Sequence, residues 1–510
     1  QAEDGIRDLV RSRGLGDVYK RQFLMTLITK KNEVFLRVDA DPHIHQELSD
    51  YFTFEVPNAK FLQKQRRYKY WDGKIRLYSP GNGELYVGLY DYLVEWLDRK
   101  GYNYNVQSNK QYGEPNESEE FVTPESVASF VRGLNLPFKI RGYQLRGLYC
   151  SIKYNRRLLL SPTGSGKSLI IYTLIRWHLF HERDILIIVP TTSLVEQLFK
   201  DFQDYGWNAR EHVNKIYAGK ERYRESPVVI STWQSIYKEP RNFFNRFDVV
   251  IGDEAHLYKA KSLTKLLTKM HSCKYRIGLT GTLDGMQCHQ LQLEGLFGPV
   301  EKVIRTDELQ KKGYLSDLKI NVLVCKHEYV EFENYQEEIE YIITHPKRNK
   351  IIVNLASDLS GNTLVLFNYI ERHGDVLRDM LNSKKGNKKL FYIHGGTDTS
   401  EREMVREICE VTSNAIILAS YGTFSTGINI KNLHNVIFAS PSKSRIRNLQ
   451  SIGRTLRKHD SKARAYLYDF ADDISNEYNR NMTLNHMVFR IKTYNDEKFD
   501  YSITEINLRK

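Results

Sequence analysis

Cysteine is scarce in this chain of 510 residues, and its five copies are widely scattered. No two of them form a C-x-x-C pair, which argues against a zinc site and against a framework of disulfide bonds. This pattern fits a reducing compartment. The chain also lacks an apolar run as long as a membrane span. We therefore expect a cytosolic protein without a membrane partner.

Acidic residues are also fewer than basic residues in this chain. The chain has 62 Asp and Glu against 75 Lys and Arg, which gives a formal net charge of +13. Such an excess predicts a polyanionic partner without identifying it. The hydrophobic fraction of 41% and the charged fraction of 27% are typical of a soluble globular protein, and the length suffices for roughly three domains.

A glycine-rich segment at residues 161–168 has the features of a phosphate-binding loop. It reads Ser-Pro-Thr-Gly-Ser-Gly-Lys-Ser and lies between two apolar runs. A strand that leads into such a turn and then into a helix surrounds phosphates with backbone N–H groups. Lys167 can reach the β- and γ-phosphates, and the Ser168 hydroxyl can hold Mg²⁺. Ser161 replaces the first glycine of the usual pattern, so this segment alone leaves an ordinary turn as the alternative.

Two adjacent carboxylates follow a second apolar segment, 247–252. They begin the sequence Asp253-Glu-Ala-His256. Cleavage of a phosphoanhydride with Mg²⁺ needs one carboxylate that orients the metal and one that polarises the attacking water. We assign these tasks to Asp253 and Glu254. A solvated acidic pair is the alternative, and burial of the preceding strand argues against it.

Apolar strands alternate with helical segments in two regions, about 127–313 and after 347. This alternation predicts two parallel sheets in tandem, each covered by helices. In the second region Gln450, Arg454 and Arg457 fall on one face of a predicted helix, at i, i+4 and i+7. Arginine stabilises the charge that builds on a transferring phosphoryl group. A solvated basic face is the alternative. The expected strands are 158–160, 185–189, 228–231, 247–251 and 276–279, then 363–367, 389–393, 415–419, 435–439 and 465–468.

The order of these segments resembles that of superfamily 2 helicases and translocases, over about residues 136–472. The chain departs from the family at Ser161 and at 280–282, where Thr-Gly-Thr replaces the commoner Ser-Ala-Thr. The matching segments are 141–144 (the adenine-reading element), 161–168 (motif I), 189–192 (Ia), 231–234 (Ib), 253–256 (II, a DEAH box), 279–282 (III), 366–368 (IV), 420–427 (V) and 450–457 (VI).

The resemblance implies an α/β fold in which two tandem RecA-like lobes hold ATP and Mg²⁺ between them, with a small α+β accessory domain at the amino terminus. The implied catalytic residues are Lys167, Asp253, Glu254, Gln450, Arg454 and Arg457. The implied nucleotide-binding residues are Gln144, Thr163, Gly164, Ser165, Gly166, Lys167, Ser168 and Gly427, with Ser168 and Asp253 at the metal. His256, Thr280 and Thr282 would couple the nucleotide site to lobe motion. Pro190, Thr191, Thr232, Trp233, Thr423 and Thr426 would contact the nucleic-acid backbone.

A basic segment with interleaved aromatic residues, 60–78, lies in the accessory region. Basic side chains can neutralise phosphates, and aromatic rings can stack on exposed bases. The alternative is a hairpin whose aromatic residues fill its own core. The residues assigned here to nucleic-acid binding are Lys64, Arg66, Arg67, Tyr70 and Trp71.

A narrower likeness, to the branched-DNA helicases of T4-type bacteriophages, covers nearly the whole chain after Met25. It rests on residues 70–77, 230–235, 419–427, 452–459 and 496–499. It implies an ATP hydrolase that remodels forks, R-loops, D-loops and Holliday junctions in phage recombination, repair and replication. We expect a monomer in the host cytoplasm, with branched or duplex DNA or RNA–DNA hybrids as partners. An ATP-dependent RNA helicase and a non-hydrolysing, ATP-gated nucleic-acid sensor remain alternatives.

The boundaries that we expect start with a non-native leader, which lacks the apolar core of a secretory signal. A basic arm that touches DNA is the alternative for that segment. The expected divisions are the leader 1–22, the accessory DNA-binding domain 23–110, a linker 111–126, lobe 1 at 127–315, a connector 316–346, lobe 2 at 347–475 and a C-terminal extension 476–510.

Overall fold

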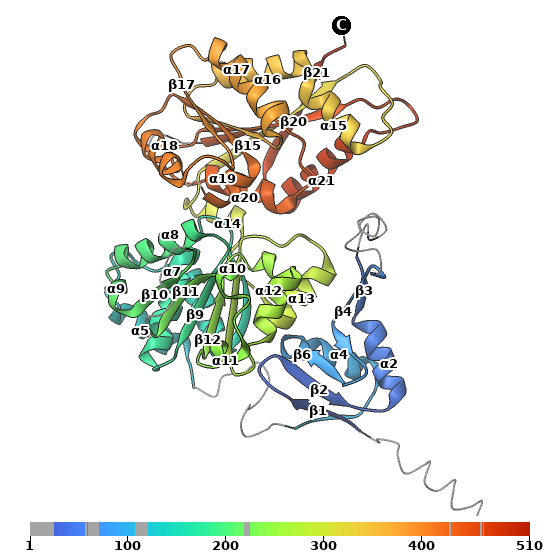
Figure 1. The fold of residues 1–510 in the computed structure, drawn as a ribbon, viewed down its shortest axis with the longest axis vertical. Helices are drawn as coiled ribbons and strands as arrows, with labels where there is room; N and C mark the ends of the chain where they lie inside the picture. The colour runs from blue at the N-terminus through green and yellow to red at the C-terminus, as the bar shows by residue number, and fades with distance from the viewer. Residues whose placement is uncertain are drawn as a thin grey trace, which may run out of the picture.

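The computed structural model describes residues 25–56, 59, 71–107, 121–218, 225–427, 430–459, 462 and 464–509. The expected leader and most of the expected linker therefore lie outside the described residues. Figure 1 shows three bodies: the accessory domain, lobe 1 beside it, and lobe 2 above lobe 1. Within the described residues, none of the helices combines the length and the apolarity that crossing a membrane requires.

The accessory domain is built on a five-stranded sheet in the order β5-β6-β2-β1-β7. β1 pairs antiparallel with β2 and parallel with β7, and the sheet packs against α4 around a buried apolar core of aliphatic and aromatic side chains. A separate antiparallel pair, β3 and β4, projects from this sheet (Figure 1). The elements are β1 (Thr26–Lys30), β2 (Phe35–Asp39), α2 (Pro42–Tyr51), β3 (Thr53–Glu55), β4 (Lys74–Arg76), β5 (Tyr78–Ser79), β6 (Glu84–Tyr86), η2 (Val87–Leu89), α4 (Tyr90–Lys100) and β7 (Tyr104–Gln107).

Lobe 1 is a seven-stranded, fully parallel sheet in the order β10-β11-β9-β12-β13-β8-β14. Its central strands are buried on both faces, as their continuous apolar runs predict. The strands are β8 (Arg156–Leu160), β9 (Ile185–Val189), β10 (Val213–Ile216), β11 (Val228–Thr232), β12 (Val249–Gly252), β13 (Tyr275–Thr280) and β14 (Val300–Lys302). The helices are α5 (Pro124–Gly133), α6 (Gly142–Lys153), α7 (Lys167–Phe180), α8 (Thr192–Asp204), α9 (Ala209–His212), α10 (Trp233–Ile236), α11 (Arg241–Phe244), η3 (Ala255–Lys259), α12 (Lys261–Thr268), α13 (Gln287–Phe297) and α14 (Thr306–Lys311).

Lobe 2 repeats this plan with a parallel sheet in the order β17-β18-β16-β19-β20-β15-β21. The predicted fold class, two tandem parallel-sheet lobes with a small α+β domain, is confirmed. The strands are β15 (Asp317–Lys326), β16 (Thr363–Phe367), β17 (Lys389–Ile393), β18 (Ala415–Ser420), β19 (Asn435–Phe438), β20 (Arg464–Asp473) and β21 (Asp500–Asn507). The helices are α15 (Tyr335–Thr344), α16 (Pro346–Asp358), η4 (Ile370–Gly374), α17 (Asp375–Lys384), α18 (Thr399–Val411), α19 (Tyr421–Gly427), α20 (Arg445–Thr455) and α21 (Met482–Asp496).

Two strands of the second sheet fall in ranges where the sequence predicts none. β15 begins in the expected connector, 316–346, and β21 lies in the expected extension, 476–510, yet each pairs along its length with the sheet. Neither has the continuous apolar run of a central strand. β15 alternates buried and half-buried positions, and β21 is a largely exposed edge strand. Both ranges therefore contribute to the sheet of lobe 2.

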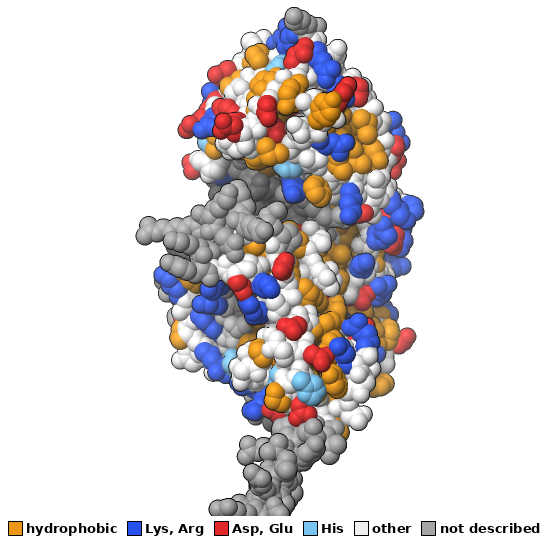
Figure 2. Space-filling model, turned by 90° about the vertical axis from the view of Figure 1, so that its right-hand side faces the viewer, with side chains coloured by type: hydrophobic (Ala, Val, Ile, Leu, Met, Phe, Trp, Pro, Cys, Tyr) orange, Lys and Arg blue, Asp and Glu red, His pale blue; other side chains and the backbone are white. Residues whose placement is uncertain are grey.

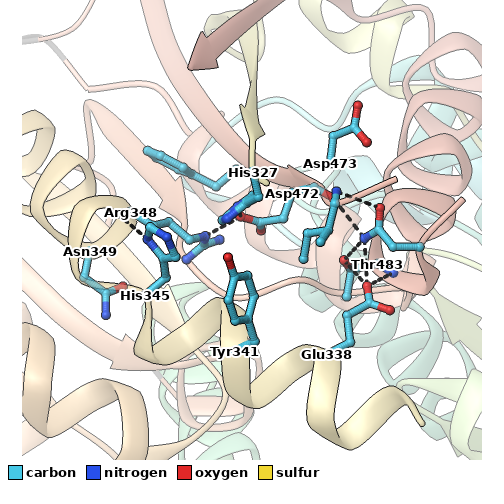
Figure 3. A network of polar contacts seen from close by, with 12 residues as sticks. His327, Glu338, Tyr341, His345, Arg348, Asn349, Asp472, Asp473 and Thr483 are labelled. Atoms are coloured by element: carbon cyan, nitrogen blue, oxygen red, sulfur yellow. Dashed lines mark hydrogen bonds and ion pairs between the residues drawn. The ribbon is translucent and has the colours of Figure 1, made fainter. Parts of the chain in front are cut away.

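A buried polar network fastens the helices of lobe 2 to these strands (Figure 3). Asp472, near the end of β20, accepts hydrogen bonds from His327 Nε2 at 3.0 Å and from Arg348 Nε at 2.7 Å. Glu338 of α15 accepts the backbone N–H groups of Met482 and Thr483 at 2.8 and 2.6 Å. A carboxylate at a helix N-terminus stabilises that helix. These contacts anchor α15, α16 and α21 to a single body.

Strand register brings the motif segments to one edge of lobe 1. β8 pairs with β13 so that Leu160 lies opposite Thr280, and β12 pairs with β9 so that Gly252 lies opposite Ile188. Because the strands are parallel, the loops after β8, β9, β12 and β13 all leave from the carboxyl ends. That edge faces lobe 2 (Figure 1).

Candidate active site

The glycine-rich segment forms a turn between β8 and α7, as its sequence predicts. Gly164 and Gly166 have φ of +83° and +86°, a region that favours glycine. The buried hydroxyls of Ser161 and Ser165 are 2.7 Å apart, so a hydrogen bond accommodates serine at the usual glycine position. Lys167 is the first residue of α7, and its Nζ donates to the carbonyl of Ser161 at 3.2 Å. This geometry suits a phosphate chain at a helix N-terminus.

Gln144 lies beneath this turn rather than in the cavity beside it. Its Nε2 donates to the carbonyl of Ser165 and its Oε1 accepts the N–H of Arg141, both at 2.9 Å. A side chain on Gly166 would collide with the Gln144 amide. The base-reading role of Gln144 stays a prediction. Arg141 and Tyr314 both line the cavity between the lobes that is described below. The Arg141 guanidinium lies 3.7 Å from the Tyr314 ring centroid.

The two carboxylates sit at the end of β12. Asp253 is buried, its N–H donates to the carbonyl of Ile188 at 3.0 Å, and its Oδ1 accepts the N–H of Glu254 at 2.9 Å. Burial raises the pKa of Asp253, as does the neighbouring Glu254, against the opposing effect of Lys167. Glu254 has φ of +48°, a conformation that few non-glycine residues adopt. Such backbone strain is concentrated at functional sites.

The three residues predicted to couple the site to lobe motion meet beside Glu254. His256 Nδ1 lies 3.0 Å from Thr280 Oγ1 and 3.4 Å from Glu254 Oε2. Thr280 Oγ1 in turn donates to the carbonyl of Thr282 at 3.0 Å. Burial lowers the pKa of His256, which favours its neutral form at physiological pH. These contacts form a chain from the carboxylate pair to the segment after β13.

Helix α20 brings the predicted residues of lobe 2 to the same place. Gln450 Nε2 donates to Glu254 Oε2 at 3.4 Å, across the gap between the lobes. Arg454 is held by the carbonyl of Phe424, to which its Nη1 donates. Burial lowers the pKa of Arg454 to about 10, with a further contribution from the nearby Arg457, while Glu254 opposes the shift. Two arginines this close favour an anion between or beside them.

A cavity of about 580 Å³ lies between the lobes, and residues of both line it. The sequence did not single out Asp201, Lys431 and Lys458, which also line it. Burial raises the pKa of Asp201, and a hydrogen bond from Ser168 opposes that effect. Lys458 directly follows motif VI, whereas nothing in the local pattern marks Asp201. The predicted residues that line the cavity are Thr163, Gly164, Gly166, Lys167, Ser168, Asp253, Glu254, Gln450, Arg454 and Arg457.

Ser165 does not line this cavity, and Gly427 is the last residue of α19. The chemistry of the donors fits Mg²⁺, because Ser168 and Asp253 both face the cavity with oxygen ligands and the buried carboxylate favours a nearby cation. In the described part of the chain no three His, Cys, Asp or Glu gather as a metal cluster. Mg²⁺ that is bound through one or two protein oxygens and the substrate phosphates does not require such a cluster.

The lobe 1 loops predicted to contact nucleic acid are neighbours on the same edge. Thr191 caps α8 by accepting the N–H of Leu194 at 3.4 Å. Thr232 is buried, with its hydroxyl 2.9 Å from that of Ser235, and it precedes α10. Turn chemistry therefore accounts for both threonine hydroxyls, as the alternative expects. Pro190 and Trp233 are half-buried beside these two residues.

The corresponding loop of lobe 2 follows β18. The hydroxyl of Ser420 donates to Thr423 Oγ1 at 2.8 Å, and Thr423 itself is buried. A second cavity of about 520 Å³ opens here, lined by Asn368, Arg402 and Thr423 among others. Thr426 belongs to α19, and only its backbone is described. A polar hollow at the ends of β16, β17 and β18 suits a phosphodiester backbone.

Comparison with known proteins gives a relative over nearly the whole chain. The ATP-dependent DNA helicase UvsW of Enterobacteria phage T4 is 35% identical over 496 residues, which are 93% of this chain and 98% of that protein. The profile described as "DNA helicase UvsW, N-terminal" matches residues 29–107. This chain belongs to the UvsW helicase family. The profiles "Type III restriction enzyme, res subunit" and "Helicase conserved C-terminal domain" match residues 137–285 and 346–459.

Two solved structures align with most of this chain. The crystal structure of T4 UvsW aligns with 95% of this chain and 100% of its own, at 31% identity and a TM-score of 0.49. The Type ISP restriction-modification enzyme LlaBIII bound to DNA aligns with 80% of this chain and 34% of its own, at 16% identity and a TM-score of 0.53. The second likeness shows the fold of the lobes alone.

The UvsW amino-terminal match includes the basic segment 60–78. Lys64, Arg66, Arg67 and Tyr70 lie outside the described residues, so their predicted role is not tested. Trp71 is half-buried, and its Nε1 donates to the carbonyl of Lys74 at 3.0 Å within the turn that leads into β4. This contact agrees with the alternative, a hairpin that packs on itself, at this one position.

Proposed function

We propose that this chain is an ATP-dependent DNA helicase that remodels branched DNA, including forks, R-loops, D-loops and Holliday junctions. One observation carries the proposal: the two lobes share a single cavity, in which Lys167 and Glu254 face Arg454 and Arg457. The hydrogen bond from Gln450 to Glu254 joins the lobes at the point of the expected chemistry. A site of this kind changes when the γ-phosphate leaves, and its lobes can then separate.

Each residue has a task in this mechanism. Lys167 and the turn before it bind the phosphates, and Ser168 with Asp253 would hold Mg²⁺. Glu254 orients and deprotonates the attacking water. Arg454 and Arg457 stabilise the charge on the γ-phosphoryl, a contribution of about 10³–10⁵ in rate for an arginine in this position. Bound Mg²⁺ would supply neutralisation of charge on the β- and γ-oxygens.

Contacts within the site would transmit the motion of lobe 2 to the loops that bind nucleic acid. His256, in contact with both Glu254 and Thr280, links hydrolysis to the segment after β13. Opening and closing of lobe 2 then shifts the loops after β16 and β18 against those after β9 and β11. Contacts of these loops with a phosphodiester backbone position a strand without reading its sequence. We infer action as a monomer in the host cytoplasm, on branched or duplex DNA and on RNA–DNA hybrids.

The decisive experiment compares ATP hydrolysis with single-stranded DNA, forked DNA and RNA as activators, followed by unwinding of forks and four-way junctions. We expect stimulation by DNA, strongest with forks, and unwinding that requires ATP and Mg²⁺. Stimulation by RNA alone would establish an RNA helicase instead.

Glu254→Gln tests the chemistry of the site. The amide keeps the shape of the side chain but cannot take a proton, so hydrolysis should fall about 10²–10⁴-fold with nucleotide binding retained. A fluorescent ATP analogue measures binding, and phosphate release measures turnover. Undiminished turnover in this variant would remove Glu254 from the reaction and leave an ATP-gated sensor as the better description.

A further inference from the structure

One stretch of lobe 1 contains cations but no acids. Residues 255–283 hold Lys259, Lys261, Lys265, Lys269, Lys274 and Arg276 without a single Asp or Glu. Four of these cations have structural partners, one of them being Lys274, whose Nζ lies 5.9 Å from the Tyr275 ring centroid. Arg276 is buried and donates to three backbone carbonyls, Lys259 pairs with Asp284 at 2.5 Å, and Lys269 donates to the carbonyls of Tyr237 and Glu239 at 2.7 Å each.

Lys261 and Lys265 are different. Both are exposed on α12, and neither side chain has an ion pair or a hydrogen bond with any residue of the described chain. Leu263, Leu266 and Leu267 bury the opposite face of the same helix. That packing holds the two lysines outward. They are four residues apart, one helical turn and about 6 Å along the axis.

Helix α12 adjoins one of the lobe 1 loops that are predicted to contact nucleic acid. Lys269, just beyond its end, is bonded to the main chain that follows α10, and α10 begins at Trp233. The rings of Trp233 and Tyr237 are in edge contact, with centroids 5.9 Å apart. Tyr237 and Leu257 are also more exposed than most large apolar residues of this lobe. Figure 1 shows α12 on the side of lobe 1 that carries the accessory domain and its β3–β4 hairpin.

We propose that the α12 surface, defined by Lys261, Lys265 and Tyr237, binds the phosphate backbone of a double-stranded arm of the DNA substrate. Lysines one turn apart, with no competing carboxylate between them, suit two phosphates of one strand. The surface lies on the flank of lobe 1, next to α10, which follows the carboxyl end of β11. A duplex arm that enters beside the accessory domain would cross this flank. Figure 2 views the molecule from that side, where Lys and Arg side chains are spread over the lower bodies.

This inference rests on the proposed function, since it takes DNA as the substrate. The test is the full-length double variant Lys261→Ala with Lys265→Ala. Its matched control is Lys347→Ala with Lys350→Ala, two exposed lysines of α16 that carry the same charge. Fluorescence anisotropy measures binding to a fork with a duplex arm and to a single strand, each over a range of salt.

We expect the α12 variant to bind the fork more weakly, with the slope of log affinity against log salt reduced by about 2, because each duplex phosphate contact contributes about 0.9. Affinity for the single strand and hydrolysis stimulated by it should match the parent, and the α16 control should match the parent throughout. Arginine at both α12 positions should restore fork binding, because the charge returns.

Fork binding with an unchanged salt slope would refute the α12 surface, and so would an equal loss of single-strand binding. Assays of the unsubstituted parent protein distinguish a wrong α12 surface from a wrong proposed function. If the parent neither hydrolyses ATP with DNA nor unwinds a fork, the proposed helicase activity fails. If the parent does both and the α12 variant equals it, only the duplex contact fails.

Discussion

At the scale of single residues, the segment from Glu254 to Thr282 carries the expected link between chemistry and motion. His256 touches Glu254 Oε2 on one side and Thr280 Oγ1 on the other, and burial lowers its pKa, which favours the neutral imidazole. A residue placed this way contacts the carboxylate without being its acid or base. We propose that it acts by positioning.

His256→Ala should therefore separate hydrolysis from unwinding. The variant keeps Lys167, Asp253 and Glu254, so nucleotide binding and basal hydrolysis should stay within a few-fold of the parent. Unwinding per ATP hydrolysed should fall about 5- to 150-fold, the usual range for a lost coupling free energy. Parallel assays of phosphate release and strand separation give this ratio. Thr280→Ser, which keeps the hydroxyl, is the control, and an equal fall in both rates for His256→Ala would contradict the coupling role.

The positions that the sequence places best are those of residues that belong to one short segment. The lysine and serine of the turn and the two carboxylates after β12 follow directly from their own short segments. Arg141 and Tyr314 do not, because they meet only through folding, with the guanidinium 3.7 Å from the ring. For Gln144 the sequence identifies the motif but not the contacts of the side chain. Its place in a motif is visible in the sequence, but the use of its amide beneath the turn is not.

At the scale of elements, the close approach of α20 to the phosphate loop depends on one glycine. A Cβ built on Gly453 would lie 2.6 Å from the Cβ of Thr163 and 3.0 Å from its Oγ1. The contact is between lobes, so only a residue without a side chain allows Arg454, the next residue, to reach the cavity. This requirement could not be read from the helix, because the partner surface belongs to the other lobe.

Gly453→Ala should hold the lobes apart. Alanine favours a helix over glycine by up to about 1 kcal/mol, so the helix itself is not weakened. A displacement near 1 Å at a catalytic group can cost about 10²-fold in rate, and we expect a loss of that order in hydrolysis. Adding Thr163→Gly removes the opposing Cβ and should restore part of the rate. Full activity in the single variant, measured at saturating ATP, would show that the lobes do not need this contact.

In the two lobes, the strands that the sequence patterns miss lie at or next to a sheet edge, although the edge strand β17 was predicted. The central strands of both lobes are continuous apolar runs and were predicted within a few residues. β10, β14, β15 and β21 were not, because edge or near-edge strands are short or half-exposed and have no such run. These strands are identified by their pairing with neighbouring strands and not by their own composition.

At the scale of the whole molecule, the accessory domain is docked on lobe 1 through a buried charge network. Glu33 accepts Lys30 Nζ at 2.8 Å and Arg156 Nη2 at 2.5 Å, and all three side chains are nearly inaccessible. Nearby, a Cβ on Gly295 of lobe 1 would lie 2.9 Å from the Cβ of Tyr86, so the two surfaces are packed as in a core. Nucleotide-driven motion should then move lobe 2 against the accessory domain and lobe 1 as one body.

Glu33→Ala should loosen that body. It leaves Arg156 and Lys30 buried side by side with no carboxylate, a change that costs about 3–5 kcal/mol. Hydrogen exchange of the amides at this contact should accelerate accordingly, since exchange there reports local opening. The matched control is Glu55→Ala, which removes an exposed ion pair with Lys74 at 3.9 Å and should cost about 0–1 kcal/mol. Exchange that stays as slow as in the parent would mean that apolar packing alone holds the domain. In that case the ionic network would serve to orient the accessory domain, and fork unwinding by Glu33→Ala would be impaired without any loosening.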